Sequence, residues 1–281
     1  MPYATLISTD ALADHLDDPG WVVVDCRFDL ADPVAGRRRY EAGHIPGAIY
    51  LALEYDLSDP KTETTGRHPL PDMAFFQQRL GQWGIGSGSQ VVGYDDAGGA
   101  YAARLWWMLR YLGHEAAAVL DGGFPRWQHE GRPSRGGIET RPAAHFSGEA
   151  SPAWRAGLAD VERLREAPDY RLVDSRDPDR FRGENETIDP VAGRIPGAAN
   201  YFFMDNLAED GTFLPAERLK SQLAAVVGDA TPERTIFYCG SGVTACLNVL
   251  AMEHIGLKGS KLFVGSWSEW ITDPDRPIAT G

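Results

Sequence analysis

The stretch that decides the fold is TIFYCGSGVT, residues Thr235–Thr244, which is followed by ACLNVLAM over residues 245–252. The apolar run predicts a short strand, the small residues predict a loop, and the last segment predicts a helix. Cys239 therefore stands where a strand passes into a loop that leads to a helix N-terminus. Because loop N–H groups and a first helical turn both favour nearby negative charge, we expect a nucleophilic thiolate at Cys239.

Four motifs of the chain occur twice, in the same order, at an offset that falls only from about 150 to about 143 residues. The matched pairs are VVVDCR at 22–27 with RLVDSR at 171–176, GHIPGA at 43–48 with GRIPGA at 193–198, VVGYD at 91–95 with TIFYC at 235–239, and VLDGGFPRW at 119–127 with LFVGSWSEW at 262–270. So long a period indicates a tandem duplication of one domain, not a solenoid. Asp95 takes the place of Cys239 in the first copy, so we expect one half to react and the other to support it.

Each half alternates short β-branched runs with helical stretches. In the second half we expect strands at 172–174, 235–238 and 261–264 and helices at 215–227 and 244–255. This alternation predicts an α/β fold in which each half is a parallel sheet with helices on both faces. Ligand sites in such sheets lie beyond the carboxyl ends of the strands, where Cys239 is expected.

The domain boundary is predicted from composition. Residues 131–151 are rich in Gly, Pro, Ser and Arg and show no periodicity, which is typical of a connector. We therefore expect an inactive N-terminal domain over 1–135, a linker over 136–150 and a catalytic C-terminal domain over 151–281.

Composition narrows the classes of function. The 281 residues are 43% hydrophobic and 24% charged, as in an ordinary globular protein. A net charge of −13 disfavours nucleic acid and anionic membrane surfaces as partners. No apolar run approaches the roughly 20 residues of a membrane span. The N-terminus lacks a basic region followed by an apolar core, so we expect no signal peptide and a cytoplasmic location.

Cysteine usage argues against a disulfide scaffold and against zinc. The chain has three cysteines, no CxxC pair and no Cys/His cluster with ligand spacing, so we expect no metal. Cys26 and Cys246 are predicted to be small buried hydrophobic residues. The glycine-rich residues 84–89 precede a strand instead of a helix, which argues against a phosphate-binding loop and nucleotide binding.

Along nearly its whole length the chain resembles the two-domain sulfurtransferases of the rhodanese superfamily. The likeness is carried by GHIPGA, DGGFPRW, CGSGVTAC and GSWSEW. The loop CGSGVT is similar to the version that uses 3-mercaptopyruvate, whereas the thiosulfate-preferring version usually carries Arg then Lys at the places of Gly240 and Ser241. The resemblance implies two tandem rhodanese-like domains and a Cys239 persulfide that passes its sulfur to a thiol, cyanide or thioredoxin, without a cofactor, in a monomer or weak dimer.

The resemblance also assigns roles to individual residues. Arg180 matches the arginine that holds the anionic end of the donor. Ser241 matches a loop serine that relays a proton to the departing enolate, and His68 matches the histidine that orients this serine. Glu54 stands where the family commonly has an aspartate that completes the relay. The loop residues expected to bind the anionic sulfur through their amides are Gly240, Gly242, Val243 and Thr244.

One feature departs from the family pattern. The 3-mercaptopyruvate enzymes usually have a second arginine shortly after the first, and residues 184–193 contain none. Arg182 and Arg194 are the candidates to replace it. Arg67, beside His68, is interpreted as structural or as a contributor to the local positive field.

Three other functions stay open at this point. The first is the same chemistry with thiosulfate as the donor. The second is a tyrosine-phosphatase-like enzyme, which is disfavoured because Ala245 occupies the place of the phosphate-binding arginine. The third is a non-enzymatic binding module, which the retained Cys239 disfavours.

Overall fold

The computed structural model describes residues 2–281, which form two compact units. The first unit runs to Asp59 and continues over Leu70–Ser151 and Leu207–Phe213. The second unit consists of Pro60–Pro69, Pro152–Asn206 and Leu214–Gly281. Residues 136–150 therefore belong to the first unit, and each unit includes a short segment from the other half of the sequence. Motif spacing could not reveal these segments, because it records order along the chain and not which loops pack together.

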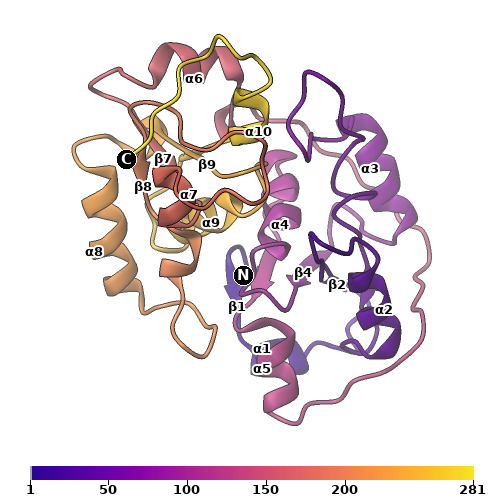
Figure 1. Ribbon diagram of the computed structural model, residues 1–281. Helices are drawn as coiled ribbons and strands as arrows, with labels where there is room; N and C mark the ends of the chain where they lie inside the picture. Colours follow the sequence, from indigo (N-terminus) through magenta and orange to yellow (C-terminus); the bar gives the residue numbers. More distant parts are fainter. Residues whose placement is uncertain (1) are drawn as a thin grey trace. The chain divides into compact units, whose positions relative to one another are not determined.

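The first unit contains a five-stranded parallel sheet with the strand order β1-β5-β4-β2-β3. Figure 1 labels β1, β2 and β4 of this sheet and the helices around it. The central strands are almost entirely buried and carry runs of valine, as expected for a parallel sheet that helices cover on both faces. The strands are β1 (Leu6–Ile7), β2 (Trp21–Asp25), β3 (Ile49–Tyr50), β4 (Gln90–Tyr94) and β5 (Ala117–Leu120). The helices are α1 (Thr9–Ala13), α2 (Ala35–Ala42), α3 (Met73–Gln82), α4 (Ala102–Tyr111) and α5 (Gly123–His129).

The second unit repeats this topology, with the strand order β6-β10-β9-β7-β8, all parallel. The predicted duplication and α/β class are therefore confirmed. The strands are β6 (Arg155–Ala156), β7 (Arg171–Asp174), β8 (Ala199–Asn200), β9 (Thr235–Tyr238) and β10 (Lys261–Phe263). The helices are α6 (Leu158–Leu164), α7 (Pro178–Arg182), α8 (Ala216–Val227), α9 (Ala245–His254) and α10 (Ser266–Trp270), with short 3-10 helices η1 (Pro152–Trp154), η2 (Phe203–Asn206) and η3 (Pro232–Arg234).

A buried ion pair at the end of one strand stabilises each unit. Asp174 ends β7, and both of its oxygens accept hydrogen bonds from the Arg176 guanidinium at 2.6–3.1 Å. Arg176 also donates to the carbonyl of Gly193 at 2.7 Å, which ties the strand end to the Ile-Pro-Gly turn. Asp25 and Arg27 repeat this arrangement in the first unit. The repeated motifs therefore mark one structural device, since unpaired charges at these buried positions would be costly.

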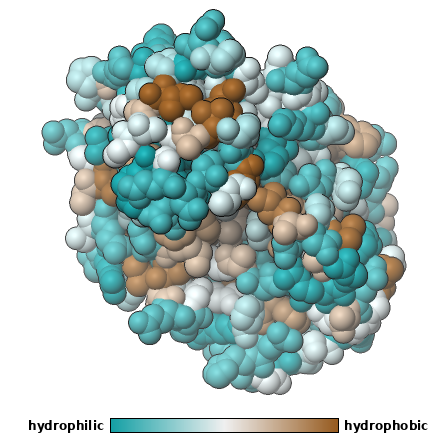
Figure 2. Space-filling view, viewed as in Figure 1, coloured by the Kyte–Doolittle hydropathy of each residue, from teal (hydrophilic) through white to brown (hydrophobic). Residues whose placement is uncertain are grey.

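The surface is mostly hydrophilic and each unit has an apolar core, as the composition of the chain predicts. The face shown in Figure 2 is mostly hydrophilic, with small separate apolar patches. Each unit has its own apolar cluster, which includes Tyr94 and Trp127 in the first and Tyr238 and Trp267 in the second. Over residues 2–281, none of the helices combines the length and the apolar character that crossing a bilayer requires.

Candidate active site

Cys239 directly follows β9 at the carboxyl end of the sheet of the second unit, as predicted. Its backbone N–H donates to Ser266 Oγ at 3.1 Å, and its carbonyl accepts from the N–H of Trp267 at 3.0 Å. The next carbonyl, that of Gly240, accepts from the N–H of Ser268 at 2.8 Å. The start of the loop is therefore fixed to the first turn of α10, and the thiol is 2% exposed.

Two glycines let the loop pass close to its neighbours. Gly242 has φ of +74°, and a Cβ at this position would lie 2.0 Å from the carbonyl oxygen of Val264. No side chain fits in that space, so the loop can follow this path only with glycine here. A Cβ on Gly240 would instead point at two arginines, 3.1 Å from Arg67 Nη2 and 3.6 Å from Arg180 Nη2.

The remaining loop residues provide backbone N–H groups that no protein acceptor uses among the described residues. Val243 is buried, and Thr244 is the N-cap residue of α9 without a side-chain capping bond. Among the described residues, the N–H groups of Ser241, Val243 and Thr244 donate to no protein acceptor. Uncommitted N–H groups at the start of a helix form a concavity that favours an anion.

The first unit shows what such a loop binds when its cysteine is replaced. Asp95 follows β4 as Cys239 follows β9, and its carboxylate accepts four backbone hydrogen bonds at 2.8 Å. The donors are the N–H groups of Ala97, Gly99, Tyr101 and Ala102. Burial raises the pKa of Asp95, and these four donors oppose that rise. In the first unit this loop therefore holds an anionic atom, the Asp95 carboxylate oxygen, which lies two bonds beyond Cβ.

His68 and Ser241 are brought together although 173 residues separate them in the sequence. His68 Nδ1 lies 2.7 Å from Ser241 Oγ, so the hydroxyl and the imidazole share a hydrogen bond. Both side chains are buried, with 3% and 6% exposure. The contact forms because Pro60–Pro69 belongs to the second unit. Glu54, the third residue of the predicted relay, lies in the first unit after β3 and is half-buried.

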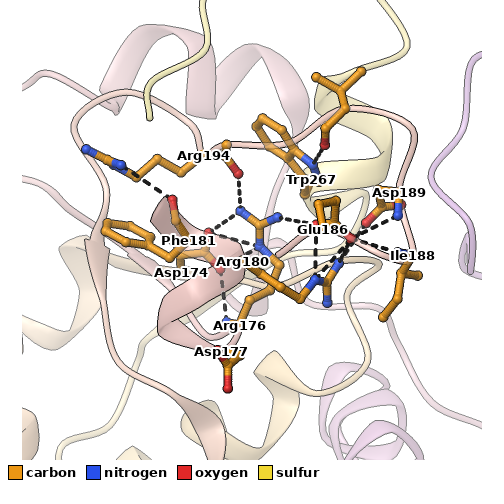
Figure 3. A network of polar contacts seen from close by, with 12 residues as sticks. Asp174, Arg176, Asp177, Arg180, Phe181, Glu186, Ile188, Asp189, Arg194 and Trp267 are labelled. Carbon is orange, nitrogen blue, oxygen red and sulfur yellow. Dashed lines mark hydrogen bonds and ion pairs between the residues drawn. The ribbon is translucent and has the colours of Figure 1, made fainter. Parts of the chain in front are cut away.

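Arg180 lies on α7 and faces two buried carboxylates (Figure 3). Its Nε donates to both oxygens of Glu186 at 3.0–3.1 Å, and its Nη2 donates to Asp189 Oδ2 at 3.0 Å. Burial alone raises the pKa of Glu186, but hydrogen bonds from Arg180 and from the N–H groups of Asp189 and Ile188 hold it below the usual range. An ionised Glu186 orients the Arg180 fork toward the cysteine loop.

Neither arginine that the sequence offered as a replacement for the missing one lies at the loop. Arg182 pairs with Asp179 and Glu184. Arg194 donates to the carbonyls of Phe181 and Gly281, and Figure 3 shows its side chain directed away from Arg180. Arg67 occupies the place beside Gly240 instead.

A pocket of about 580 Å³ borders this part of the second unit. It contains one lysine and two acidic residues, and two of its lining residues also hold the site. Asp189 binds Arg180, and Ser268 supports Gly240. The lining residues are Lys61, Thr62, Glu63, Asp189, Pro190, Ser268, Ile271 and Thr272.

The other two cysteines have different surroundings. Cys26 is fully buried, and burial together with Asp25 raises the pKa of its thiol far above the usual range. Cys246 is buried in α9 and donates a hydrogen bond from Sγ to the carbonyl of Gly242 at 3.4 Å. Neither environment favours a thiolate. Within residues 2–281, groups of three or more His, Cys, Asp or Glu side chains placed to hold a metal ion are absent.

Sequence reasoning assigned no role to two charged residues at this site, Glu186 and Asp189, and named Arg67 only as structural or as a contributor to the local positive field. Glu186 and Asp189 lie in residues 184–193, where the family pattern predicts a second arginine. That pattern gives no role to an acidic residue in this segment. The only sequence feature that placed Arg67 near the site is its position directly before His68.

Comparison with known proteins gives consistent matches. The model of the rhodanese-like domain matches residues 8–130 and 158–273. A probable 3-mercaptopyruvate sulfurtransferase of Pseudomonas aeruginosa is 45% identical over 283 residues, covering 100% of both chains. A putative thiosulfate sulfurtransferase of Mycobacterium tuberculosis is 40% identical over 92% of this chain and 90% of its own. The structure of 3-mercaptopyruvate sulfurtransferase from Leishmania major superposes with a TM-score of 0.85 at 32% identity, covering 95% of this chain and 74% of that one.

Proposed function

Because the chain belongs to the rhodanese family, with a rhodanese-like domain in each half, we propose that it is a sulfurtransferase that takes sulfur from 3-mercaptopyruvate. The observation that carries this proposal is the pair of duplicated loops. One cradle holds the Asp95 carboxylate, and its counterpart carries Cys239 beside uncommitted N–H groups. In a persulfide the outer sulfur is also two bonds beyond Cβ, so it would occupy the place of an Asp95 oxygen.

In the proposed first half-reaction the Cys239 thiolate attacks the donor sulfur. A sulfur–sulfur bond forms, and the carbon–sulfur bond of 3-mercaptopyruvate breaks with its electron pair going to carbon. The products are the Cys239 persulfide and the enolate of pyruvate, which takes up one proton. The loop N–H groups stabilise the negative charge on sulfur without reorganising, because the hydrogen bonds to α10 already fix the loop.

Ser241 and His68 are proposed to supply that proton. The Ser241 hydroxyl is two residues from Cys239, and its hydrogen bond to His68 Nδ1 gives it a partner from which it can regain a proton. Glu54 is proposed to assist His68, as the family resemblance suggests. The first domain, predicted over 1–135, has a supporting role in this scheme because Asp95 replaces the nucleophile.

The second half-reaction returns the enzyme to its starting state. An acceptor thiolate attacks the outer sulfur, forms a new persulfide and releases the Cys239 thiolate, so electrons and atoms balance without an external redox partner. A small thiol or thioredoxin can serve in this role; cyanide, the other candidate acceptor, would attack the outer sulfur through carbon, form thiocyanate and release the Cys239 thiolate. The acceptor, a cytoplasmic location and a monomeric or weakly dimeric state stay predictions.

Intact mass measured after incubation with each donor tests the proposed function. With 3-mercaptopyruvate we expect the protein to gain one sulfur atom and to lose it on addition of a thiol. Thiosulfate is the second candidate donor, and the absence of an Arg–Lys pair at Gly240 and Ser241 predicts slower loading from it. A higher specificity constant for thiosulfate would reverse the donor assignment, and no mass gain from either donor would reject the transferase.

Arg180→Ala is expected to raise the KM for 3-mercaptopyruvate by roughly 10- to 100-fold, because a charge-assisted hydrogen bond to the donor carboxylate is lost. The measurement is steady-state kinetics over a range of donor concentrations. Arg163→Ala is the control, since the Arg163 side chain on α6 is 66% exposed and forms an ion pair with the exposed Asp160. An unchanged KM would remove Arg180 from the donor site.

A further inference from the structure

The first unit contains a small cavity, and the proposed sulfur transfer uses none of its residues. The cavity has a volume of about 160 Å³, and the residues that line it belong to the first unit alone. Its lining includes three aromatic rings, one isoleucine and two arginines, namely Tyr40, Tyr50, Trp83, Ile49, Arg37 and Arg141. Apolar surface and positive charge therefore meet in one place.

The hydroxyl groups of the two tyrosines already have partners within the protein. Tyr40 donates to the carbonyl of Ala48 at 2.9 Å and accepts the N–H of Glu139 at 2.9 Å. Tyr50 donates to the carbonyl of Arg27 at 3.2 Å. What these residues offer to a ligand is therefore their rings, against which a ligand would bury apolar surface.

Residues 138–141 form one side of the cavity and are fixed by hydrogen bonds around them. Directly before Ile138, the N–H of Gly137 donates to the carbonyl of Glu41 at 2.8 Å. At the other end of this segment, Arg141 donates to the carbonyl of Pro19 at 3.1 Å. Because these bonds form without a ligand, binding would cost little conformational entropy of the protein.

The duplicated fold does not require the aromatic lining. β3 and β8 pair with equivalent strands, in a register that matches Tyr50 of the first unit to Asn200 of the second. Trp83 directly follows α3, whereas Gly228 directly follows the equivalent helix α8. The second unit thus builds the same sheet without either ring, so the demands of the sheet do not account for them.

Arg37 supplies a cation whose donors are available. Its Cζ lies 5.2 Å from the centroid of the Tyr50 ring, and its ion-pair partner Glu41 is 3.6 Å away, beyond hydrogen-bonding distance. Over residues 2–281, no acceptor takes a hydrogen bond from this guanidinium. The side chain is 52% exposed, so a solute can reach it. A planar guanidinium with unused donors favours a carboxylate.

Size and charge together define the class of ligand. A cavity of about 150 Å³ accommodates a benzene molecule, whereas pockets for drug-sized ligands begin near about 300 Å³. The cations Arg37 and Arg141 line the cavity, and the carboxylate among the lining residues, that of Glu139, is already paired with Arg135 at 3.0 Å. The cavity therefore suits a single ring that carries one negative charge.

We propose that this cavity binds a monocyclic aromatic carboxylate, whose ring packs against Tyr50 and Trp83 and whose carboxylate pairs with Arg37. Because Arg37 lies over the Tyr50 ring, a ligand ring beside Tyr50 brings its carboxylate to the guanidinium. The site lies in the first unit, so this inference does not depend on the proposed sulfur transfer.

Calorimetric titration of the full-length protein with benzoate tests the site. We expect saturable binding and a Tm that rises with benzoate concentration. In Arg37→Ala the dissociation constant should rise by at least about tenfold, because charge-assisted hydrogen bonds are lost. Arg38→Ala is the matched control and should leave this constant unchanged, since Arg38 is next to Arg37 on α2 but pairs with Asp32.

Two further measurements test the ring and the charge separately. Trp83→Ala should also weaken benzoate binding, because part of the apolar wall is removed. Benzyl alcohol, which has the same ring without the charge, should bind at least about tenfold more weakly than benzoate to the wild-type protein. If Trp83→Ala does not fold, Arg37→Ala decides the question, because the exposed Arg37 side chain can be removed without disturbing the core.

A carboxylate can also bind beside Cys239, and Arg180→Ala identifies that alternative. If Arg180→Ala abolishes benzoate binding while Arg37→Ala leaves it unchanged, benzoate occupies the second unit and the inference is wrong. Absence of binding to the wild-type protein, or equal binding of benzoate and benzyl alcohol, would also overturn it. Sulfur loading of Arg37→Ala should equal that of the wild-type protein, so the failure of the transferase proposal and the failure of this inference are separate results.

Discussion

Cys239→Ser is expected to abolish sulfur transfer, with a fall in rate of at least about a thousandfold. The serine hydroxyl is a far weaker nucleophile than a thiolate and cannot hold a transferable sulfane sulfur. Its smaller side chain still fits the buried position, and the backbone bonds to Ser266 and Trp267 do not depend on the side chain. Intact mass after donor treatment should show no added sulfur, and donor consumption should fall to background.

Cys246→Ser provides the control for that experiment. A serine hydroxyl can donate to the carbonyl of Gly242 as the Cys246 thiol does, so most activity should remain. Thermal unfolding of both variants should stay close to that of the wild-type protein, which would separate lost chemistry from lost folding. Full activity in Cys239→Ser would end the persulfide mechanism.

Asp95→Ala is expected to have the second large effect, a loss of about 2–4 kcal/mol of stability in the first unit. The substitution leaves four backbone N–H groups, all bonded to Asp95 at 2.8 Å, without an acceptor in a buried loop. Unsatisfied buried donors lose their bonds to water without replacement. Denaturant titration followed by tryptophan fluorescence should show an earlier first transition, because Trp106 and Trp107 lie on α4, which the loop precedes.

Asp96→Ala is the neighbouring control. Asp96 forms an ion pair with Arg39 at 3.2 Å, and the Arg39 side chain is 39% exposed, so screening by water limits the loss to at most about 1 kcal/mol. Equal stability of the Asp95 and Asp96 variants would show that solvent replaces the carboxylate. The cradle argument for the cysteine loop would then lose its support from the first unit.

Much of the fold could be predicted because local patterns and tertiary contacts agree. The predicted strand at 235–238 is β9, and the helix predicted at 244–255 is α9, Ala245–His254. The paired motifs correctly predicted a tandem duplication, and the structure adds that the two sheets have the same strand order. The Asp-x-Arg and Ile-Pro-Gly motifs could be located but not explained, because the bond from Arg176 to Gly193 joins residues that are distant in the sequence.

The site was predicted in part, for the same physical reason. Cys239, Gly240 and Gly242 were identifiable because strand, tight loop and helix follow one another directly along the chain. The interpretation of Arg67 as structural or as a contributor to the local positive field stays a prediction, since nothing in GRHPLP tells which acceptors the arginine meets. Only the packed structure shows Asp189 turning two guanidinium groups toward Gly240.

By itself, the order of residues determined the doubled α/β architecture, the position of Cys239 after a strand and the presence of Asp95 at the same place in the first copy. These features depend on periodicity, chain continuity and residue identity. Tertiary structure alone decided that Pro60–Pro69 joins the second unit and which cations stand beside Gly240. The docking of Pro60–Pro69 requires Gly66, which is small enough to pack against Gly265. The placement of the cations requires the buried carboxylate of Asp189, which pairs with Arg67 and Arg180. Both contacts arise only when segments that are distant in the sequence meet.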